Sequence, residues 1–510
     1  MWYKKSIAKL VSEAEQSGEG TLKRTLSSSG LIALGIGAII GAGLFSLTGI
    51  AAADHAGPAV MLSFIVAAVG CAFAGLCYAE FASMIPVAGS AYTYSYATMG
   101  EFMAWIIGWD LVLEYALAGA TVAVSWSQYF NELMQIMGIH LPQQLLAGPW
   151  EGGMINLPAI IIVCLLSLLL MRGTQESSVV NNILVILKVS VVILFIVLGW
   201  QFINPANHTP FIPTNEGEEL VKQGKMGWGE FFSSGYFGHY GISGILRASA
   251  VVFFAFIGFD AVSTAAQEAK NPKKGMPIGI IGSLVICTIL YVLFSYVMTG
   301  LAPYTAFSGD AKPVATAFEK TGYHFLNTAM IVTIIAGYTS VILVMLLGQS
   351  RVFYSMSKDG LLPKIFSDLS KRQTPWKTNL IFMVFVSIFA GFVPVSDLGH
   401  MRQGFVPVSD LGHMVSIGTL FAFTLVCIGV LVLRKTNPNI ERPFKTPLVP
   451  LVPILGILVC IAMMASLPLV SWERLGIWMA IGVAIYFLYG YRHSKLRKER
   501  EAQGKIGSQE

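Results

Sequence analysis

Glycine recurs within one apolar stretch near the start of the chain, GIGAIIGAGLF at residues 35–45. Because glycine weakens the interior of a helix, we expect a helix here to unwind around Gly41 and Gly43. Its second half would then begin with free backbone N–H groups and a positive dipole end, which suit an anion. In lipid, such groups are tolerated only where they line a buried cavity or a ligand. The stretch is therefore compatible with a binding site for an anion, although on its own it does not distinguish such a site from close helix packing.

A second apolar stretch, VVFFAFIGFDAVSTAAQEAKNP at residues 251–272, is interrupted by Gly258 and Asp260. Transporters built from inverted repeats place a broken helix at the matching position of each half, with the substrate between the two. The alternative for the first stretch is that Gly37 and Gly41 form a GxxxG motif for close helix packing. The presence of a second candidate break favours the binding site.

One lysine, Lys188 in NNILVILKVSVVILF, lies about one-third of the way into an apolar run without an acidic neighbour on its own helix. An ionisable side chain inside the membrane is a functional site by default. Either Lys188 reaches the interface along its own helix, or it donates to carbonyls opened by the first break. Burial disfavours the charged form of a lysine, so in the second case it can release a proton inside a closed site.

Several carboxylates also lie in apolar surroundings. Glu114, in GWDLVLEYALAGA, is predicted to face a substrate ammonium or a proton path, and Asp110 lies one helical turn before it. Bonding to a neighbouring helix is the alternative for both residues. Glu80 is interpreted as a structural or gate contact, and Asp260 is expected to hold its own broken helix together.

The elements that position these residues are membrane helices. Of the 510 residues, 55% are hydrophobic and only 12% are charged, whereas about 25% are charged in a soluble domain. A span needs about 20 apolar residues, and the sequence predicts twelve such helices. They lie near residues 30–54, 57–84, 102–133, 156–172, 179–202, 247–266, 277–300, 327–350, 378–393, 413–434, 448–470 and 474–492.

Lysine and arginine gather in the two terminal segments and in every second connection. This bias predicts a multi-pass protein with both termini in the cytoplasm. We expect it to lie in the plasma (inner) membrane. The net charge of +5 therefore reflects topology and requires no nucleic-acid partner. The cysteines lie in apolar runs and form no metal motif. No nucleotide-binding or nucleophile motif is present, so we expect neither an enzyme nor a metal or organic cofactor.

Five ordered motifs carry a resemblance to a known family. They are GIGAIIGAGLF, FASMIPVAGSAYTYSYATMGEFMAWIIGWDLVLEY, FFAFIGFDAVSTAAQEAKNPKKGMPIGI, GQSRVFYSMSKDGLLPKIF and RPFKTPLVPLVPILG. From about residue 24 to 492 the chain resembles the amino acid–polyamine–organocation superfamily. Within it, the chain is most similar to cationic amino acid transporters and their bacterial proton-coupled relatives. One departure is Gln267-Glu268, where the family usually has two acidic residues.

The resemblance implies an all-α polytopic membrane protein. Its LeuT-type core would consist of a five-plus-five inverted repeat, followed by two additional C-terminal helices. The implied segments are a cytoplasmic N-terminal segment (1–27), a first repeat (28–202), an outside loop (203–246), a second repeat (247–434), two peripheral helices (435–492) and a cytoplasmic tail (493–510).

The two breaks and the resemblance together indicate a site for an α-amino acid. Backbone N–H groups of the first break would hold the carboxylate, and carbonyls of the second break would accept from the ammonium. Phe254 is expected to act as an aromatic gate, although ordinary packing is its alternative, and Tyr338 is expected to limit the pocket volume. Proton-coupled members of the family carry a lysine at the position of Lys188, which implies proton coupling there. The substrate-binding set is Ile40, Gly41, Ala42, Gly43, Leu44, Glu114, Phe254, Ala255, Ile257 and Tyr338.

We therefore expect a secondary active transporter that takes up small neutral L-amino acids with protons by alternating access. Alternatives are a cationic amino acid uniporter or exchanger and a polyamine or organic-cation antiporter; a channel or a membrane-embedded enzyme fits less well. Sodium coupling and an accessory membrane subunit stay open. A tandem duplication, GFVPVSDLGHM at 391–401 and 404–414, has no functional interpretation.

Overall fold

The computed structural model describes residues 3–15, 24–87, 89–149, 153–233, 236–310, 312–392 and 408–506. These ranges fold into helices, with two isolated β-bridges and no strand element among them. The greater part of the tandem duplication lies outside the described residues.

The first apolar run forms a broken helix. Ser27 caps α2 (Ser28–Ile39) by accepting a hydrogen bond from the Gly30 N–H at 3.1 Å. Regular helix stops at Ile39, and the chain resumes through η1 (Gly43–Leu47), α3 (Thr48–Ala51) and η2 (Ala52–Ala56). The interruption therefore falls at 40–42, beside the glycines that predict it.

The sixth apolar run is broken in the same manner. Helix α12 (Gly241–Val252) passes into η9 (Phe253–Phe256), loses helical geometry, and resumes as α13 (Ala261–Thr264) and η10 (Ala266–Glu268). Gly258 lies in the gap with φ of +113°, a backbone conformation that residues with a side chain rarely adopt.

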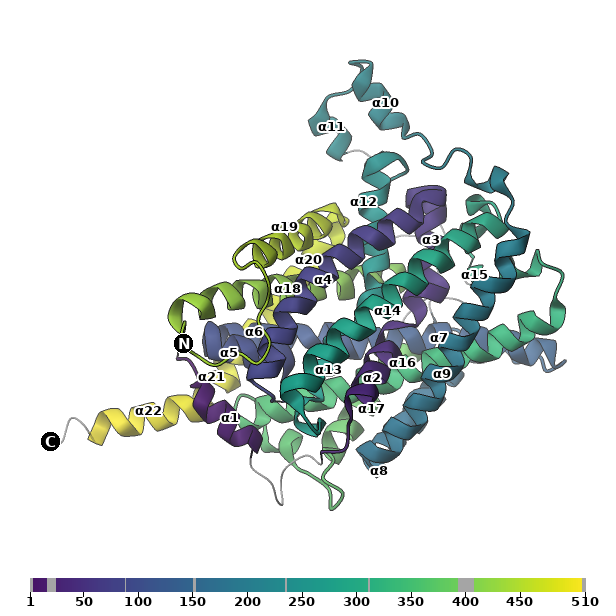
Figure 1. Ribbon diagram of the computed structural model, residues 1–510. Helices are drawn as coiled ribbons and strands as arrows, with labels where there is room; N and C mark the ends of the chain where they lie inside the picture. Colours follow the sequence, from purple (N-terminus) through teal and green to yellow (C-terminus); the bar gives the residue numbers. More distant parts are fainter. Residues whose placement is uncertain are drawn as a thin grey trace.

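Long helices surround these two broken segments (Figure 1). They are α4 (Val60–Met84), α6 (Glu101–Val112) with η4 (Leu113–Leu117) and α7 (Ala118–Ile136), α8 (Leu157–Arg172), α9 (Thr174–Gly199), α14 (Pro272–Leu301), α16 (His324–Lys358), α17 (Trp376–Phe392), α18 (Val408–Thr436), α19 (Leu451–Ser466) and α20 (Leu469–Ile485).

Shorter helices lie at the two ends of the bundle. Figure 1 shows α10 (Glu216–Lys222) and α11 (Trp228–Ser233) projecting at the top, whereas α1 (Ile7–Glu15) and α22 (Lys495–Ile506) lie together at the opposite end. The ammonium of Lys5, just before α1, contacts the Asp359 carboxylate at the end of α16 at 2.7 Å. Both termini therefore lie on the same side of the bundle.

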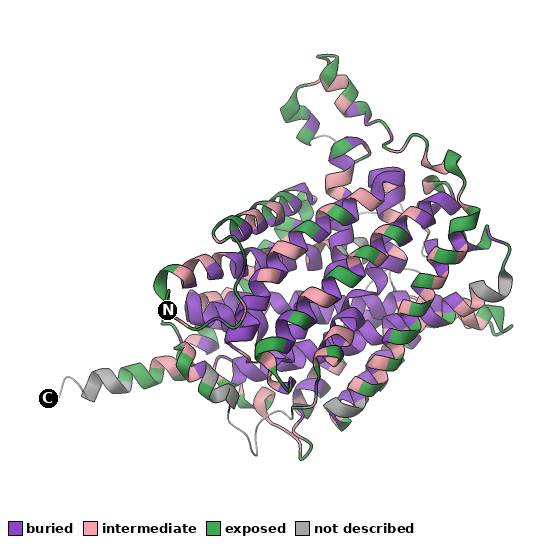
Figure 2. Cartoon of the chain, in the orientation of Figure 1, coloured by how far each residue is buried: buried purple, intermediate pink, exposed green. Residues whose placement is uncertain are grey.

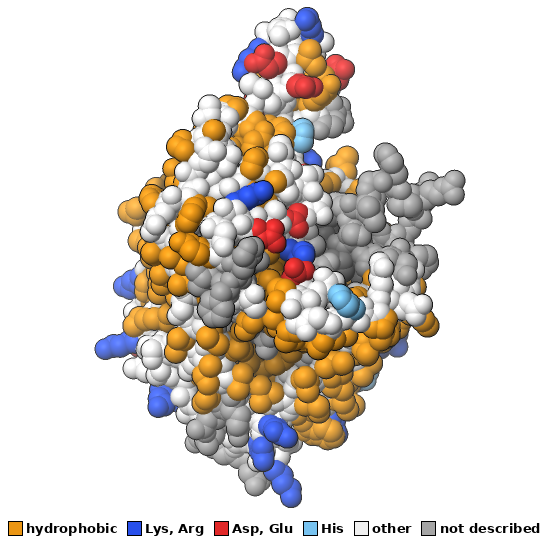
Figure 3. Space-filling model, turned by 90° about the vertical axis from the view of Figure 1, so that its right-hand side faces the viewer, with side chains coloured by type: hydrophobic (Ala, Val, Ile, Leu, Met, Phe, Trp, Pro, Cys, Tyr) orange, Lys and Arg blue, Asp and Glu red, His pale blue; other side chains and the backbone are white. Residues whose placement is uncertain are grey.

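In the part of the chain that the structure describes, eight helical segments are long and apolar enough to cross a membrane, and one of them, Ser28–Met84, includes both α2 and α4. Helices α8, α17 and α19 are apolar but shorter. Figure 2 shows a buried centre with exposed positions on the outer helices, and hydrophobic side chains cover much of the face in Figure 3. Because the outward surface is apolar, the chain is a polytopic membrane protein.

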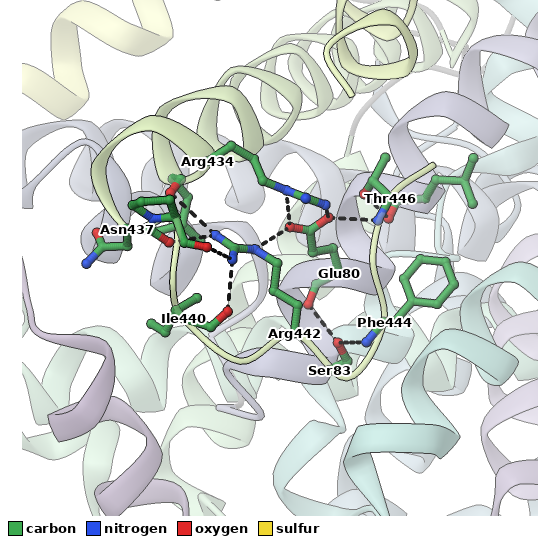
Figure 4. A network of polar contacts seen from close by, with 11 residues as sticks. Glu80, Ser83, Arg434, Asn437, Ile440, Arg442, Phe444 and Thr446 are labelled. Carbon is green, nitrogen blue, oxygen red and sulfur yellow. Dashed lines mark hydrogen bonds and ion pairs between the residues drawn. The ribbon is translucent and has the colours of Figure 1, made fainter. Parts of the chain in front are cut away.

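A polar network fixes the connection between α18 and α19 against the end of α4 (Figure 4). The Glu80 carboxylate is 2.8 Å from Arg434 Nη2 and 3.1 Å from Arg442 Nε, and it accepts from the Thr446 N–H at 2.8 Å. Arg442 also donates to the Asn437 carbonyl near the end of α18. Of the two expectations for Glu80, these contacts fit the structural one.

Candidate functional site

A small cavity lies where the two broken helices face each other. The space open to a water-sized molecule is about 10 Å³, which holds at most about one water. The two breaks are therefore closed against each other, and a larger ligand requires them to separate. The cavity is lined by Ala38, Ile39, Gly41, Ala42, Gly43, Ala118, Val122, Phe254, Ile257, Val341 and Met345.

Glycine lets the two breaks touch. A Cβ atom at Gly43 would lie 2.2 Å from the Ala255 Cα, and one at Gly258 would lie 2.5 Å from the Ala38 Cβ. Carbon atoms normally approach to about 3.5–4.0 Å. Each break therefore depends on a glycine facing the other broken helix.

Some backbone groups expected to bind substrate are already engaged in this conformation. The N–H groups of Leu44 and Phe45 donate to the Gly41 carbonyl at 3.0 and 3.1 Å, and the Ile257 N–H donates to the Phe254 carbonyl at 3.3 Å. The expected role of the Leu44 N–H in holding a carboxylate would therefore require its bond to Gly41 to open.

A tyrosine hydroxyl bridges the two breaks. The Tyr291 oxygen is 2.7 Å from the Ile39 carbonyl of the first break and 2.8 Å from the Ala255 carbonyl of the second. A hydroxyl has one proton, so it donates fully to only one of these carbonyls at a time. The other carbonyl keeps capacity for a further donor, such as an ammonium group.

Lys188, fully buried on α9, contacts the first break from the side. Its ammonium donates to the carbonyls of Gly37 at 2.7 Å and Ile40 at 2.9 Å, and to the Ser340 hydroxyl at 3.3 Å. All three partners are neutral. The structure thus places this lysine against the opened carbonyls, which is the second of the two positions that the sequence allows.

The carboxylates of the third and sixth spans meet away from the cavity lining. Asp260 is expected to hold its own broken helix together. In the structure it accepts a hydrogen bond from the Tyr115 hydroxyl and so also joins the sixth span to the third. Glu114 interacts with Asp260, Asp110 and Thr419. Across the described ranges, no group of three or more histidine, cysteine or acidic side chains is arranged to hold a metal ion.

Five of the predicted substrate-binding residues line the cavity: Gly41, Ala42, Gly43, Phe254 and Ile257. Ile40, Leu44 and Ala255 belong to the two breaks, but they are not among the lining residues. Glu114 and Tyr338 are not among them either.

Tyr338, which is expected to limit the pocket volume, is not among the residues that line the closed cavity. Its hydroxyl lies 2.7 Å from Ser46 Oγ, and its ring packs against Phe45 and Tyr129. The closed pocket is instead bounded on α16 by Val341 and Met345.

Sequence reasoning missed the lining residues on the third and eighth spans. Ala118 and Val122 are four residues apart, as are Val341 and Met345, so each pair shares one face of a helix. This spacing can be seen in the sequence. However, apolar residues on the other faces of the same helices show the same spacing, so it does not identify the face that lines the cavity.

A closed pocket between two broken helices inside a polytopic bundle defines a membrane transporter. A family model described as amino acid permease matches residues 26–487. The chain belongs to this family, within the amino acid–polyamine–organocation superfamily and its cationic amino acid transporter branch, and it is an amino acid transporter.

The curated relatives cover most of the chain. A branched-chain amino acid permease, BcaP, of Bacillus subtilis (strain 168) is 45% identical over 500 residues, which are 97% of this chain and 98% of the relative. A methylthioribose transporter of the same organism is 41% identical, covering 95% of this chain and 97% of the relative. Cationic amino acid transporter 4, vacuolar, of Arabidopsis thaliana is 37% identical over 83% of this chain and 66% of the relative.

Proposed function

We propose that this protein takes up small neutral L-amino acids together with protons by alternating access, across the plasma membrane. The observation that carries this proposal is the chemistry of the closed cavity. Every lining residue has an apolar side chain or none, so the polar groups available to a ligand belong to the backbone of the two breaks. An α-amino acid with an apolar side chain matches this arrangement, since its carboxylate and ammonium can bind the backbone.

The same chemistry argues against a cationic side chain in the pocket. A charged group costs free energy when buried without a partner, and no lining side chain is acidic. Ile39, Val122 and Met345 offer aliphatic contacts instead. The similarity to a branched-chain amino acid permease supports aliphatic substrates, so we include branched-chain residues among the ligands to be tested.

The similarity to a methylthioribose transporter suggests a second ligand class. A sugar carries several hydroxyl groups that need hydrogen-bond partners, and the site's lining offers no polar side chain for them. We therefore expect methylthioribose to bind more weakly than valine or alanine.

Proton coupling is assigned to Lys188. Its burial favours the neutral form, whereas the carbonyls of Gly37 and Ile40 favour the charged form. Protonation and deprotonation of the ammonium would therefore change the hydrogen bonds that hold the first break. Sodium remains the alternative coupling ion.

The proposed architecture is a twelve-helix LeuT-type protein with a five-plus-five inverted repeat and cytoplasmic termini. Helices α2 and α4 would count as separate spans, and α8, α17 and α19 would complete the set. The broken segments at the first and sixth positions support the repeat.

The test is uptake into proteoliposomes that contain the purified protein. Wild-type protein should accumulate radiolabelled alanine or valine when the lumen is alkaline, and dissipating the proton gradient should abolish accumulation. Lys188→Ala should stop proton-driven accumulation, while counterflow exchange persists if binding does not need the charge. Glu114→Gln is the comparison: loss of accumulation there, with Lys188→Ala unaffected, would contradict the assignment to the lysine.

A further inference from the structure

The last apolar helix ends in a sharp corner. Helix α20 continues through η13 (Tyr486–Gly490) and α21 (Tyr491–His493), and the backbone turns at Ser494 before α22 begins. Ser494 is buried, donates to the Glu101 carboxylate, and accepts from the Arg497 N–H at 3.2 Å. The corner is therefore fixed to the start of α6, and this contact holds α21 and α22 at a defined angle to each other.

A groove of about 470 Å³ lies at this corner. It is lined by Phe487, Tyr491, Arg492, Arg497, Lys498 and Glu501. Three of these side chains are cationic and one is anionic. The groove therefore carries an excess of positive charge.

The pairing inside the groove leaves two cations available. Arg497 pairs with Glu501 at 2.6 Å and lies 3.8 Å from the centre of the Tyr491 ring. Arg492 and Lys498 are both exposed, and neither has an anionic partner among the described residues. The site therefore complements an anion placed between these two side chains.

The groove continues an apolar surface. In η13, Phe487 is 43% exposed and Leu488 is 70% exposed. In α20, which leads directly into η13, Ile477 and Ile481 are exposed as well. In a membrane protein, such residues face acyl chains. A ligand that occupies both surfaces must therefore have an apolar part next to an anionic part.

We propose that this groove binds the phosphate headgroup of an anionic phospholipid, in the leaflet on the side of the two termini. Arg492 and Lys498 would donate to the phosphate oxygens, while the glycerol backbone and acyl chains would lie along Phe487 and Leu488. Clusters of lysine and arginine next to a membrane helix attract anionic lipids in this manner. A free phosphate compound offers the same headgroup chemistry but leaves the apolar surface uncovered.

The test measures lipid binding by the full-length protein in a neutral detergent. Short-chain phosphatidylglycerol, short-chain phosphatidylcholine and glycerol 3-phosphate are titrated separately, and binding is followed by native mass spectrometry and by the melting temperature. We expect phosphatidylglycerol to bind saturably and the other two to bind much more weakly. Arg492→Gln/Lys498→Gln should weaken phosphatidylglycerol binding roughly 30-fold, since two charges near the headgroup are lost.

Two matched variants make the result specific. Lys273→Gln/Lys274→Gln removes the same charge from exposed residues at the start of α14 and should leave lipid binding unchanged. Arg492→Lys/Lys498→Arg keeps both charges and should retain binding. Wild-type affinity in the Arg492→Gln/Lys498→Gln protein would overturn the site. Equal binding of glycerol 3-phosphate would overturn the lipid and indicate a soluble anion, and equal binding of phosphatidylcholine would overturn the charge recognition.

Discussion

The contact between the two broken helices can be tested at a single atom. Gly43→Ala adds one Cβ atom, which would lie 2.2 Å from the Cα and 2.5 Å from the backbone nitrogen of Ala255. An ordinary carbon contact is about 3.5–4.0 Å, so the two breaks must separate by roughly 1.3–1.8 Å. The neighbouring atoms are the backbone and the Cβ of Ala255, and none of them can be moved by a side-chain rotation.

The expected effect follows from which conformation suffers the clash. Overpacking of this kind costs about 1–3 kcal/mol. Without ligand, the breaks can relieve this cost by moving apart. If the cost falls on the substrate-bound conformation, in which the ligand fills the space between the breaks, substrate affinity falls roughly 5- to 150-fold. Gly43→Val, with a larger and branched side chain, should abolish binding.

The measurement is substrate binding by isothermal titration calorimetry on purified protein, with the melting temperature as the test of folding. Gly119→Ala is the matched control, because its Cβ would have no neighbour closer than 3.7 Å and it follows a cavity-lining residue. That variant should bind as the wild type does. If Gly43→Ala and Gly119→Ala bind substrate equally well, the close approach of the two breaks is not needed for binding.

Three further changes test other contacts. Arg351 Nε donates to the Glu268 carboxylate at 2.7 Å in a fully buried pair. Arg351→Met leaves this carboxylate without its partner, so the free energy of unfolding, followed through the melting temperature, should fall by about 3–5 kcal/mol. A fall of less than about 1 kcal/mol would contradict this. Val341→Ala enlarges the cavity and should shift the ligand ranking in a thermal-shift series toward longer side chains, while Tyr338→Ser should leave it unchanged; the opposite pattern would return Tyr338 to the pocket. Burial lowers the pKa of His208 from its ordinary value of 6.5. As the pH falls, the unfolded state therefore binds a proton at this residue before the folded state does. The stability contributed by neutral His208 is present above pH 6.5 and is lost as the pH falls below it. The wild-type melting temperature should therefore drop more steeply than that of His208→Gln between pH 7 and 5, and parallel curves would exclude this contribution.

The sequence predicts those parts of the site that depend on local backbone chemistry. Glycine at 41, 43 and 258 marks both interruptions, because few other residues tolerate the close approach or the positive φ. Lys188 could be identified because a charge in an apolar run needs partners, and opened carbonyls are the nearest ones that a broken helix supplies.

Other parts depend on how the helices are rotated against each other, which no single helix encodes. Glu268 and Arg351 form a buried pair between the sixth and eighth spans, but in sequence each only appears as a charge near a span end. Tyr338 and Val341 lie within one turn of the same helix, and only the packing of α16 against the first break decides which one reaches the cavity. The network around Glu80 likewise requires the connection after α18 to fold back onto α4.

The proposed coupling of protons to substrate has a physical basis in one short backbone segment. The Ile40 carbonyl accepts from Lys188, and the next residue, Gly41, lines the cavity. On this mechanism, a ligand that binds the first break and a proton that binds Lys188 both act on the same peptide groups. Linkage is reciprocal, so a proton that raises substrate affinity must itself bind more tightly by the same factor when substrate is present. Coupling would then need no direct contact between the lysine and the substrate. The pocket has an apolar lining with no charged side chain that could carry a proton, which is consistent with a proton site outside the substrate pocket.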